Sequence, residues 1–184
     1  MAKAVDLLKA GCPTDLPSTP TGRIEAMRVR LSGMLEAVRT ARAPLAKFYD
    51  LLNDEQKARF NALPSGEENE PERRRNLSVL CSARASGIAS VPIRRMELAV
   101  RPDEVQRTSL RALQEAIGQA GELLKTDCPT YSPITPVVRV DAMEQRLDAM
   151  LRALNIVQPA LEKFYGSLTD EQKERFNRLA PAQG

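Results

Sequence analysis

Apolar side chains recur every three or four residues along two long stretches of the chain, a spacing typical of amphipathic α-helices. Each stretch opens with Thr followed by Pro, which suit the N-cap and the first position of a helix. One helix is expected to start at Pro20, and the other to run from Pro136 to Gly166. The apolar positions are Ile24, Met27, Leu31, Met34, Leu35, Val38, Leu45 and Phe48 in the first helix, and Val140, Met143, Leu147, Met150, Leu151, Leu154, Leu161 and Phe164 in the second.

The second stretch repeats the first. Residues 7–63 match residues 123–179 without a gap, so that Cys12 corresponds to Cys128 and Phe48 to Phe164. A match of this length indicates an internal duplication. We interpret residues 1–63 as a first unit, residues 64–76 as a linker, and residues 77–184 as a second, complete unit. The first unit starts partway through the pattern, so we expect it to be truncated at its N-terminal side.

A short helix is expected after each long one, because the sequence there has the pattern of a capping box. Thr169 can cap the helix, and Gln172 three residues later can bond back to the N–H of the cap. The first unit has Asn at the cap, which serves about as well as Thr. The motif residues are Leu52, Asn53 and Gln56 in the first unit, and Leu168, Thr169 and Gln172 in the second.

The remaining helices are expected ahead of the long ones. Residues 102–125 keep a helical period, with Pro102 at the first helical position. Shorter helices are expected over residues 77–85 and 91–100, and residues 2–10 resemble the last turns of the 102–125 helix. An interior proline removes a backbone hydrogen bond, so both long helices should bend, at Pro44 and Pro159.

Composition favours an all-α fold. Hydrophobic residues make up 42% of the chain, aromatic residues make up 4%, and Trp is absent. Leu, Ala and Met suit helices better than a sandwich or a barrel, where β-branched and aromatic residues dominate. The net charge of +3 is spread over both signs, which does not favour nucleic acid as a partner. No stretch approaches the ~20 apolar residues that span a bilayer, and the N-terminus lacks the apolar core of a secretory signal.

Catalytic chemistry is not expected. Histidine is absent, which removes the commonest general base and metal ligand. The three cysteines lack the close spacing of a zinc site. No phosphate-binding glycine loop or nucleophile motif is present. We therefore expect a protein that is not an enzyme and that needs no cofactor or metal.

The series of motifs resembles a known family. Leu168 to Gln172 fits a Leu-Thr-x-x-Gln signature and follows a long helix that contains methionine. With Cys128-Pro129 and the Asp170 to Phe176 run, it is similar to the LTXXQ-motif, Spy/CpxP-like periplasmic helical proteins. The resemblance implies a curved all-α cradle in the periplasm that holds unfolded proteins without ATP. Some relatives instead sense metal or restrain a stress-sensor kinase.

The cysteines allow two interpretations. Cys12 and Cys128 correspond in the repeat, whereas the counterpart of Cys81 would fall before Met1. An oxidising compartment favours one disulfide per unit, Cys81 with Cys128, and would leave Cys12 without its partner. Three reduced thiols are the alternative.

The methionines on the long helices also allow two interpretations. Either they pack in the core, or their flexible side chains line an adaptable surface for clients. Nearby arginines could attract unfolded segments, although a solvated helix face would carry arginines too. The candidate client-binding residues are Arg23, Met27, Arg30, Met34, Arg139, Met143, Arg146 and Met150.

Three functions stay open at this point. The first is a passive chaperone that binds unfolded clients weakly on a curved amphipathic surface. The second is an envelope-stress adaptor that binds a folded sensor protein, and the third is a helical structural module. Either the two units pair within one chain as an internal pseudo-dimer, or the chain forms a homodimer.

Overall fold

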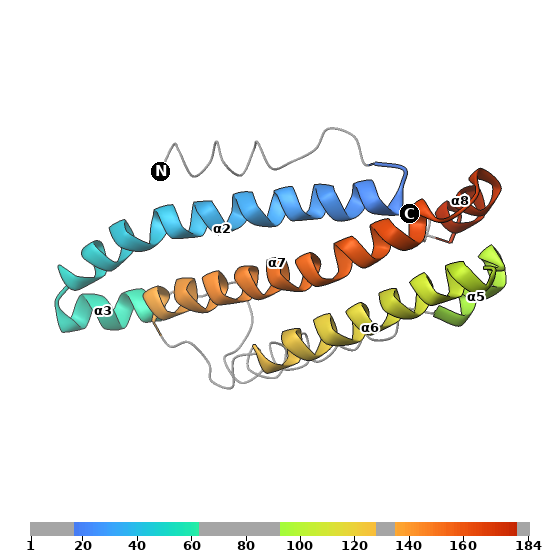
Figure 1. Ribbon diagram of the computed structural model, residues 1–184. Coiled ribbons are helices and arrows are strands. Elements are labelled where there is room, and N and C mark those ends of the chain that lie inside the picture. The colour runs from blue at the N-terminus through green and yellow to red at the C-terminus, as the bar shows by residue number, and fades with distance from the viewer. Residues whose placement is uncertain (1–16, 63–92, 128–134, 180–184) are drawn as a thin grey trace.

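The computed structural model describes residues 17–62, 93–127 and 135–179 (Figure 1). These residues form six α-helices and no strand. The expected all-α fold is therefore confirmed. The helices expected over residues 2–10 and 77–85 lie outside the described residues, and so do Cys12, Cys81 and Cys128.

The two long helices are α2, Pro20–Asp50, and α7, Pro136–Gly166, each of 31 residues. The hydroxyl of Thr19 accepts a hydrogen bond from the N–H of Gly22, and that of Thr135 accepts one from Val138. Both helices continue through their interior prolines. A proline removes one backbone hydrogen bond, but the neighbouring residues keep their own bonds, so the helix curves and does not end. Figure 1 shows this curvature in α2.

The shorter helices are α3, Asp54–Asn61, α5, Ile93–Val100, α6, Glu104–Thr126, and α8, Asp170–Asn177. The expected start of α6 is wrong by two residues. Asp103 is its N-cap, and the carboxylate accepts a hydrogen bond from the N–H of Gln106 at 2.8 Å. Pro102 therefore precedes the cap, because a carboxylate that satisfies a free backbone N–H makes a better helix start than Pro102 itself does.

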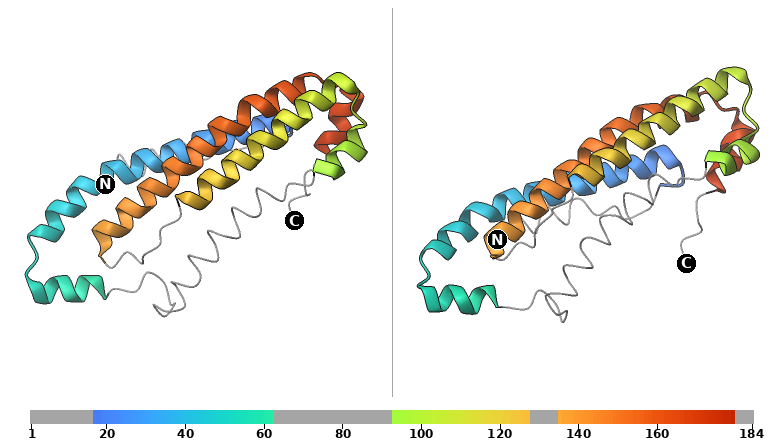
Figure 2. Two further views of the ribbon diagram at one scale, coloured as in Figure 1. Left: turned by 60° about the horizontal axis from the view of Figure 1, so that its bottom comes forward. Right: turned by 90° about the horizontal axis from the view of Figure 1, so that it is seen from below.

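The long helices form a layer in which α7 lies between α2 and α6 (Figure 1). α7 packs against both neighbours and runs antiparallel to each. At the far ends of the layer, α3 follows α2, and α8 follows α7 and packs on α5. Figure 2 shows α3 at one end and α8 with α5 at the other, all turned to the same side of the long helices. The described part thus has a cradle-like outline.

The core has two parts. The larger cluster joins α5, α6, α7 and α8, and its buried members are Val100, Leu110, Leu113, Ile117, Leu161, Phe164, Leu168 and Phe176. The smaller cluster lies between α6 and α7, with Ala120, Leu124, Ala149 and Ala153 buried. Small side chains there let the two helix backbones approach closely. Most of the buried apolar mass therefore supports the second half of the chain.

Candidate functional site

The contact between α2 and α7 sets the geometry of the candidate site. Arg42 Nε donates to Asp141 Oδ1 at one end of the contact, and Gln158 Nε2 donates to Glu25 Oε2 at 3.3 Å at the other. In the sequence repeat Arg42 corresponds to Gln158, and Glu25 to Asp141. The two links are thus the same contact made in the two directions, as in the interface of a two-fold symmetric dimer.

This relation places corresponding residues on one face. A two-fold axis that exchanges two antiparallel helices stands perpendicular to the plane in which both helices lie. Rotation about this axis does not move a residue from one side of the plane to the other. Met27 of α2 and Met143 of α7 correspond in the repeat, and each is 52% exposed. The two half-exposed methionines therefore lie on the same face of the α2/α7 layer.

Each exposed methionine has arginines on its own helix face. Positions three and four residues away are neighbours on a helix surface. Arg23 and Arg30 occupy these positions around Met27, and Arg139 and Arg146 occupy them around Met143. The site therefore combines apolar and cationic groups at two corresponding places.

Three of the arginines also bind the backbone of the fold. Arg23 donates to the carbonyl oxygens of Pro17 and Ser18, at 3.0 and 3.2 Å. Arg139 Nη2 donates to the carbonyl of Asn61 at the end of α3, at 3.4 Å. Arg146 Nη1 donates to the carbonyl of Leu124 in the last turn of α6, at 3.1 Å, where a cation also opposes the helix dipole. Arg30 is exposed on α2.

The two remaining methionine candidates are less accessible. Met34 and Met150 are both partly buried, and Met150 packs against the small cluster between α6 and α7. Their positions fit the core-packing interpretation better than the client-surface one. Of the four methionines, Met27 and Met143 offer the most surface.

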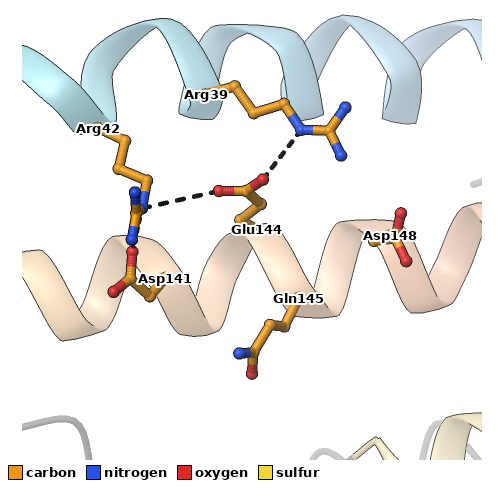
Figure 3. Close-up of a pocket in the computed structure, with 6 residues that line it drawn as sticks. All are labelled: Arg39, Arg42, Asp141, Glu144, Gln145 and Asp148. Carbon is orange, nitrogen blue, oxygen red and sulfur yellow. Dashed lines mark hydrogen bonds and ion pairs between the residues drawn. The ribbon is translucent and has the colours of Figure 1, made fainter.

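An open polar groove of about 540 Å³ also lies between α2 and α7 (Figure 3). Arg39 Nε donates to Glu144 at 2.9 Å, and Arg42 binds Asp141 and lies 4.0 Å from Glu144. Hydrogen bonds from Arg39 to Glu144 and from Arg42 to Asp141 raise the pKa of each guanidinium, so both stay charged. The groove is lined by Arg39, Arg42, Asp141, Glu144, Gln145 and Asp148.

These charges hold the two helices together. Arg39 pairs with Glu144 and Arg42 pairs with Asp141 across the two helices. No group of three or more Cys, Asp or Glu side chains among the described residues could hold a metal ion. The groove therefore lies along the contact between α2 and α7.

The capping motif forms after both long helices. Asn53 and Gln56 make a complete capping box at α3, and Thr169 and Gln172 make one at α8. Leu168 is buried in the main core, and Leu52 is partly buried. The motif thus fixes two equivalent helix–turn–helix corners, one at each end of the α2/α7 layer.

Gln172 has a second role, which the sequence analysis missed. Its side chain is buried, and its amide group pairs with that of Gln106 on α6. The sequence gives no direct signal for this pairing, because the capping-box spacing of Asp103 and Gln106 predicts only a bond from Gln106 to its own cap. The signature glutamine therefore joins helices as well as capping one.

A scan against family models matches the LTXXQ motif family protein model to residues 2–64 and 89–180. No curated protein and no solved structure matches the chain. In the part that the structure describes, no helix is long and apolar enough to cross a membrane. The matched residues include both long helices, both capping motifs and the α5–α6 segment, and they cover most of the sequence. The chain belongs to the LTXXQ motif family.

Proposed function

We propose that this protein is an ATP-independent periplasmic chaperone that binds unfolded protein segments on the α2/α7 face of its helical layer. The observation that carries the proposal is the pair of half-exposed methionines, Met27 and Met143, on one face of that layer. Family membership supports the periplasmic location, since LTXXQ proteins are typically periplasmic. The proposal assigns the protein a binding role without catalysis.

Methionine suits such a surface for physical reasons. Its unbranched thioether side chain has several rotatable bonds and is polarizable, so it can adapt to apolar groups of different shapes. A flexible surface binds many sequences weakly rather than one sequence tightly. Unfolded proteins share exposed apolar side chains and little else, and this matches what Met27 and Met143 can recognise.

The arginines supply the second attraction. Arg30 is exposed one turn from Met27 and is available to an acidic or polar part of a client. Charges of this kind raise the rate of encounter more than the final affinity, and salt screens them. A client would thus be captured electrostatically and retained by contact with the methionines.

The test is aggregation of two unrelated unfolding proteins, with and without the full chain and in the absence of ATP. We expect suppression of both at near-stoichiometric amounts, with a weaker effect at high salt. The double variant Met27→Ser with Met143→Ser should lose most of the protection. Val105→Ser is the matched control, because Val105 is 75% exposed on α6, outside the α2/α7 face.

Two results would contradict the proposal. One is protection of neither protein by the parent chain, which would direct the search to a single folded envelope partner. The other is equal loss of protection in the double variant and in the Val105→Ser control, which would mean that the methionines do not form the binding surface.

A further inference from the structure

The corners α2–α3 and α7–α8 have the same internal geometry. The ring centroids of Phe48 and Phe60 lie 5.7 Å apart, and those of Phe164 and Phe176 lie 5.8 Å apart, each pair in an edge-to-face arrangement. At the residues that directly follow these phenylalanines, the hydroxyl of Tyr49 bonds to Asn61 at 3.1 Å, as that of Tyr165 bonds to Asn177 at 3.2 Å. The two corners are therefore built alike.

Their burial differs. Phe164 is fully buried, whereas Phe48 is 50% exposed. Gln172 is buried, whereas Gln56 is exposed. The difference arises because α5 and α6 cover the α7–α8 corner, with Val100, Leu110, Leu113 and Ile117 in its core. Among the described helices, none packs in the same way on α3.

The α7–α8 corner, which we call the covered corner, also contains a polar contact. Gln106 Nε2 donates to Gln172 Oε1 at 2.9 Å and to the carbonyl of Ser167 at 2.8 Å. Gln172 Nε2 donates to Gln106 Oε1 at 2.9 Å and to the carbonyl of Val100 at 3.2 Å. A partner of this corner therefore needs an amide side chain as well as apolar ones, because a buried amide group must find both donors and acceptors.

The α2–α3 corner already contains a glutamine in the position that Gln172 has at the α7–α8 corner. Gln56 Oε1 accepts a hydrogen bond from the N–H of Asn53 at 3.0 Å, which fixes the amide at the start of α3 as the capping box fixes Gln172 in α8. The apolar residues around it are the same residue types as in the covered corner. The set that we name the open corner is Leu45, Phe48, Leu52, Gln56 and Phe60, and its counterparts are Leu161, Phe164, Leu168, Gln172 and Phe176.

We infer that the open corner is a docking site for an amphipathic helical segment supplied in trans, with the chemistry of α5–α6. Such a segment presents a glutamine in the first turn of a helix and apolar residues four, seven and eleven positions later, as at Gln106, Leu110, Leu113 and Ile117. The chain itself shows that this pattern binds this set of side chains. The inference does not depend on the proposed chaperone function, since it concerns a different surface and a folded helical partner.

The probe is a fluorescent peptide with the sequence of residues 93–127, titrated into the full chain and followed by fluorescence anisotropy. We expect saturable binding of one peptide per chain. Phe48→Ala and Gln56→Glu should each weaken it by about tenfold or more, which corresponds to about 1.4 kcal/mol. Glutamate at position 56 can still accept the Asn53 N–H in the capping box but cannot donate to the peptide.

Leu51→Ser is the matched control. Leu51 is 85% exposed at the C-cap of α2, beside the open corner but outside it, and its counterpart in the covered corner is Ser167. The variant should bind the peptide like the parent. A peptide with Leu113→Asp should not bind, because it would bury a carboxylate against the phenylalanines.

Hydrogen exchange gives an independent readout of the binding site. Peptide binding should slow exchange of the backbone amides of α3 relative to the free chain. The inference is overturned if the peptide does not bind. It is also overturned if binding is insensitive to both Phe48→Ala and Gln56→Glu, because the peptide would then occupy another site, such as the covered corner after displacement of α5–α6.

Discussion

The side-chain amides of Gln106 and Gln172 donate to each other, with both nitrogen–oxygen distances at 2.9 Å. Both residues occupy the third position of a helix and close a capping box, so each oxygen also accepts the N–H of its own cap. Their remaining N–H groups donate to the carbonyls of Ser167 and Val100. The pair is thus a fully satisfied polar contact inside the main core, and it fixes α6 against α8.

Removing one member of this pair should destabilise the fold. In Gln106→Ala the buried amide of Gln172 loses the partner that both donates to it and accepts from it, and the carbonyl of Ser167 loses its donor, which costs about 1–3 kcal/mol. Gln56→Ala, at the exposed counterpart of Gln172, removes one solvent-accessible bond and should cost less than about 1 kcal/mol. Denaturant unfolding of both variants measures the difference. An equal loss of stability in the two variants would mean that the contact between the two buried amides adds no stability beyond that of the capping bond.

Two phenylalanines at corresponding places should have unequal effects on stability. Phe164→Ala opens a cavity in the main core and should cost about 3–5 kcal/mol, which can exceed the stability of the chain. Phe164→Leu keeps more of the volume and should cost about 1–1.5 kcal/mol. Phe48→Ala removes a half-exposed side chain and its edge-to-face contact with Phe60, so it should cost less than Phe164→Ala. Thermal unfolding followed by circular dichroism ranks the three variants. If Phe48→Ala destabilises the chain as much as Phe164→Ala does, the open corner is covered in solution.

The arginines beside the exposed methionines should separate into structural and surface residues. Arg146→Met removes the hydrogen bond to the carbonyl of Leu124 and the favourable charge at the end of α6, so we expect a loss of about 1 kcal/mol or more. Arg30→Met should change the free energy of unfolding by less than about 0.5 kcal/mol, as exposed substitutions usually do. Urea unfolding gives both values. Arg30→Met should then be the variant that lowers client protection without lowering stability.

The contact between Glu25 and Gln158 should weaken in acid. A hydrogen bond from Arg28 holds the pKa of the Glu25 carboxyl below its ordinary value of 4.5, and the amide of Gln158 contributes in the same direction. A pKa that is lower in the folded state means that the carboxylate stabilises the fold above pH 4.5 and that this effect is lost as the pH falls through the lowered pKa.

The variant Glu25→Gln isolates this effect. It should be less stable than the parent near neutral pH, and the difference should shrink as the pH falls below 4.5. Unfolding of parent and variant is compared at each pH, so that the titration of all other carboxyl groups cancels. A difference that stays constant down to about pH 3 would exclude a contribution from ionised Glu25.

The sequence by itself determined the helices. Apolar residues three and four positions apart define α2 and α7, and Thr before Pro defines where each one starts, because both signals depend only on neighbours along the chain. The capping motifs at Asn53 and Thr169 were predicted correctly for the same reason. One local prediction was wrong, the start of α6, where Asp103 competes with Pro102 for the cap.

Only the tertiary structure decided which side chains are buried. Phe48 and Phe164 have similar sequence surroundings, yet one is half exposed and the other is fully buried. Burial depends on α5 and α6, which are distant in sequence from α2 and which pack on α8 and α7. The pairing of Gln106 with Gln172 also required the fold, since a glutamine three residues after a cap predicts a bond to that cap but not a partner on another helix. Local hydrogen bonds are therefore readable from the sequence, whereas the contacts that distinguish the two corners depend on which helices pack together.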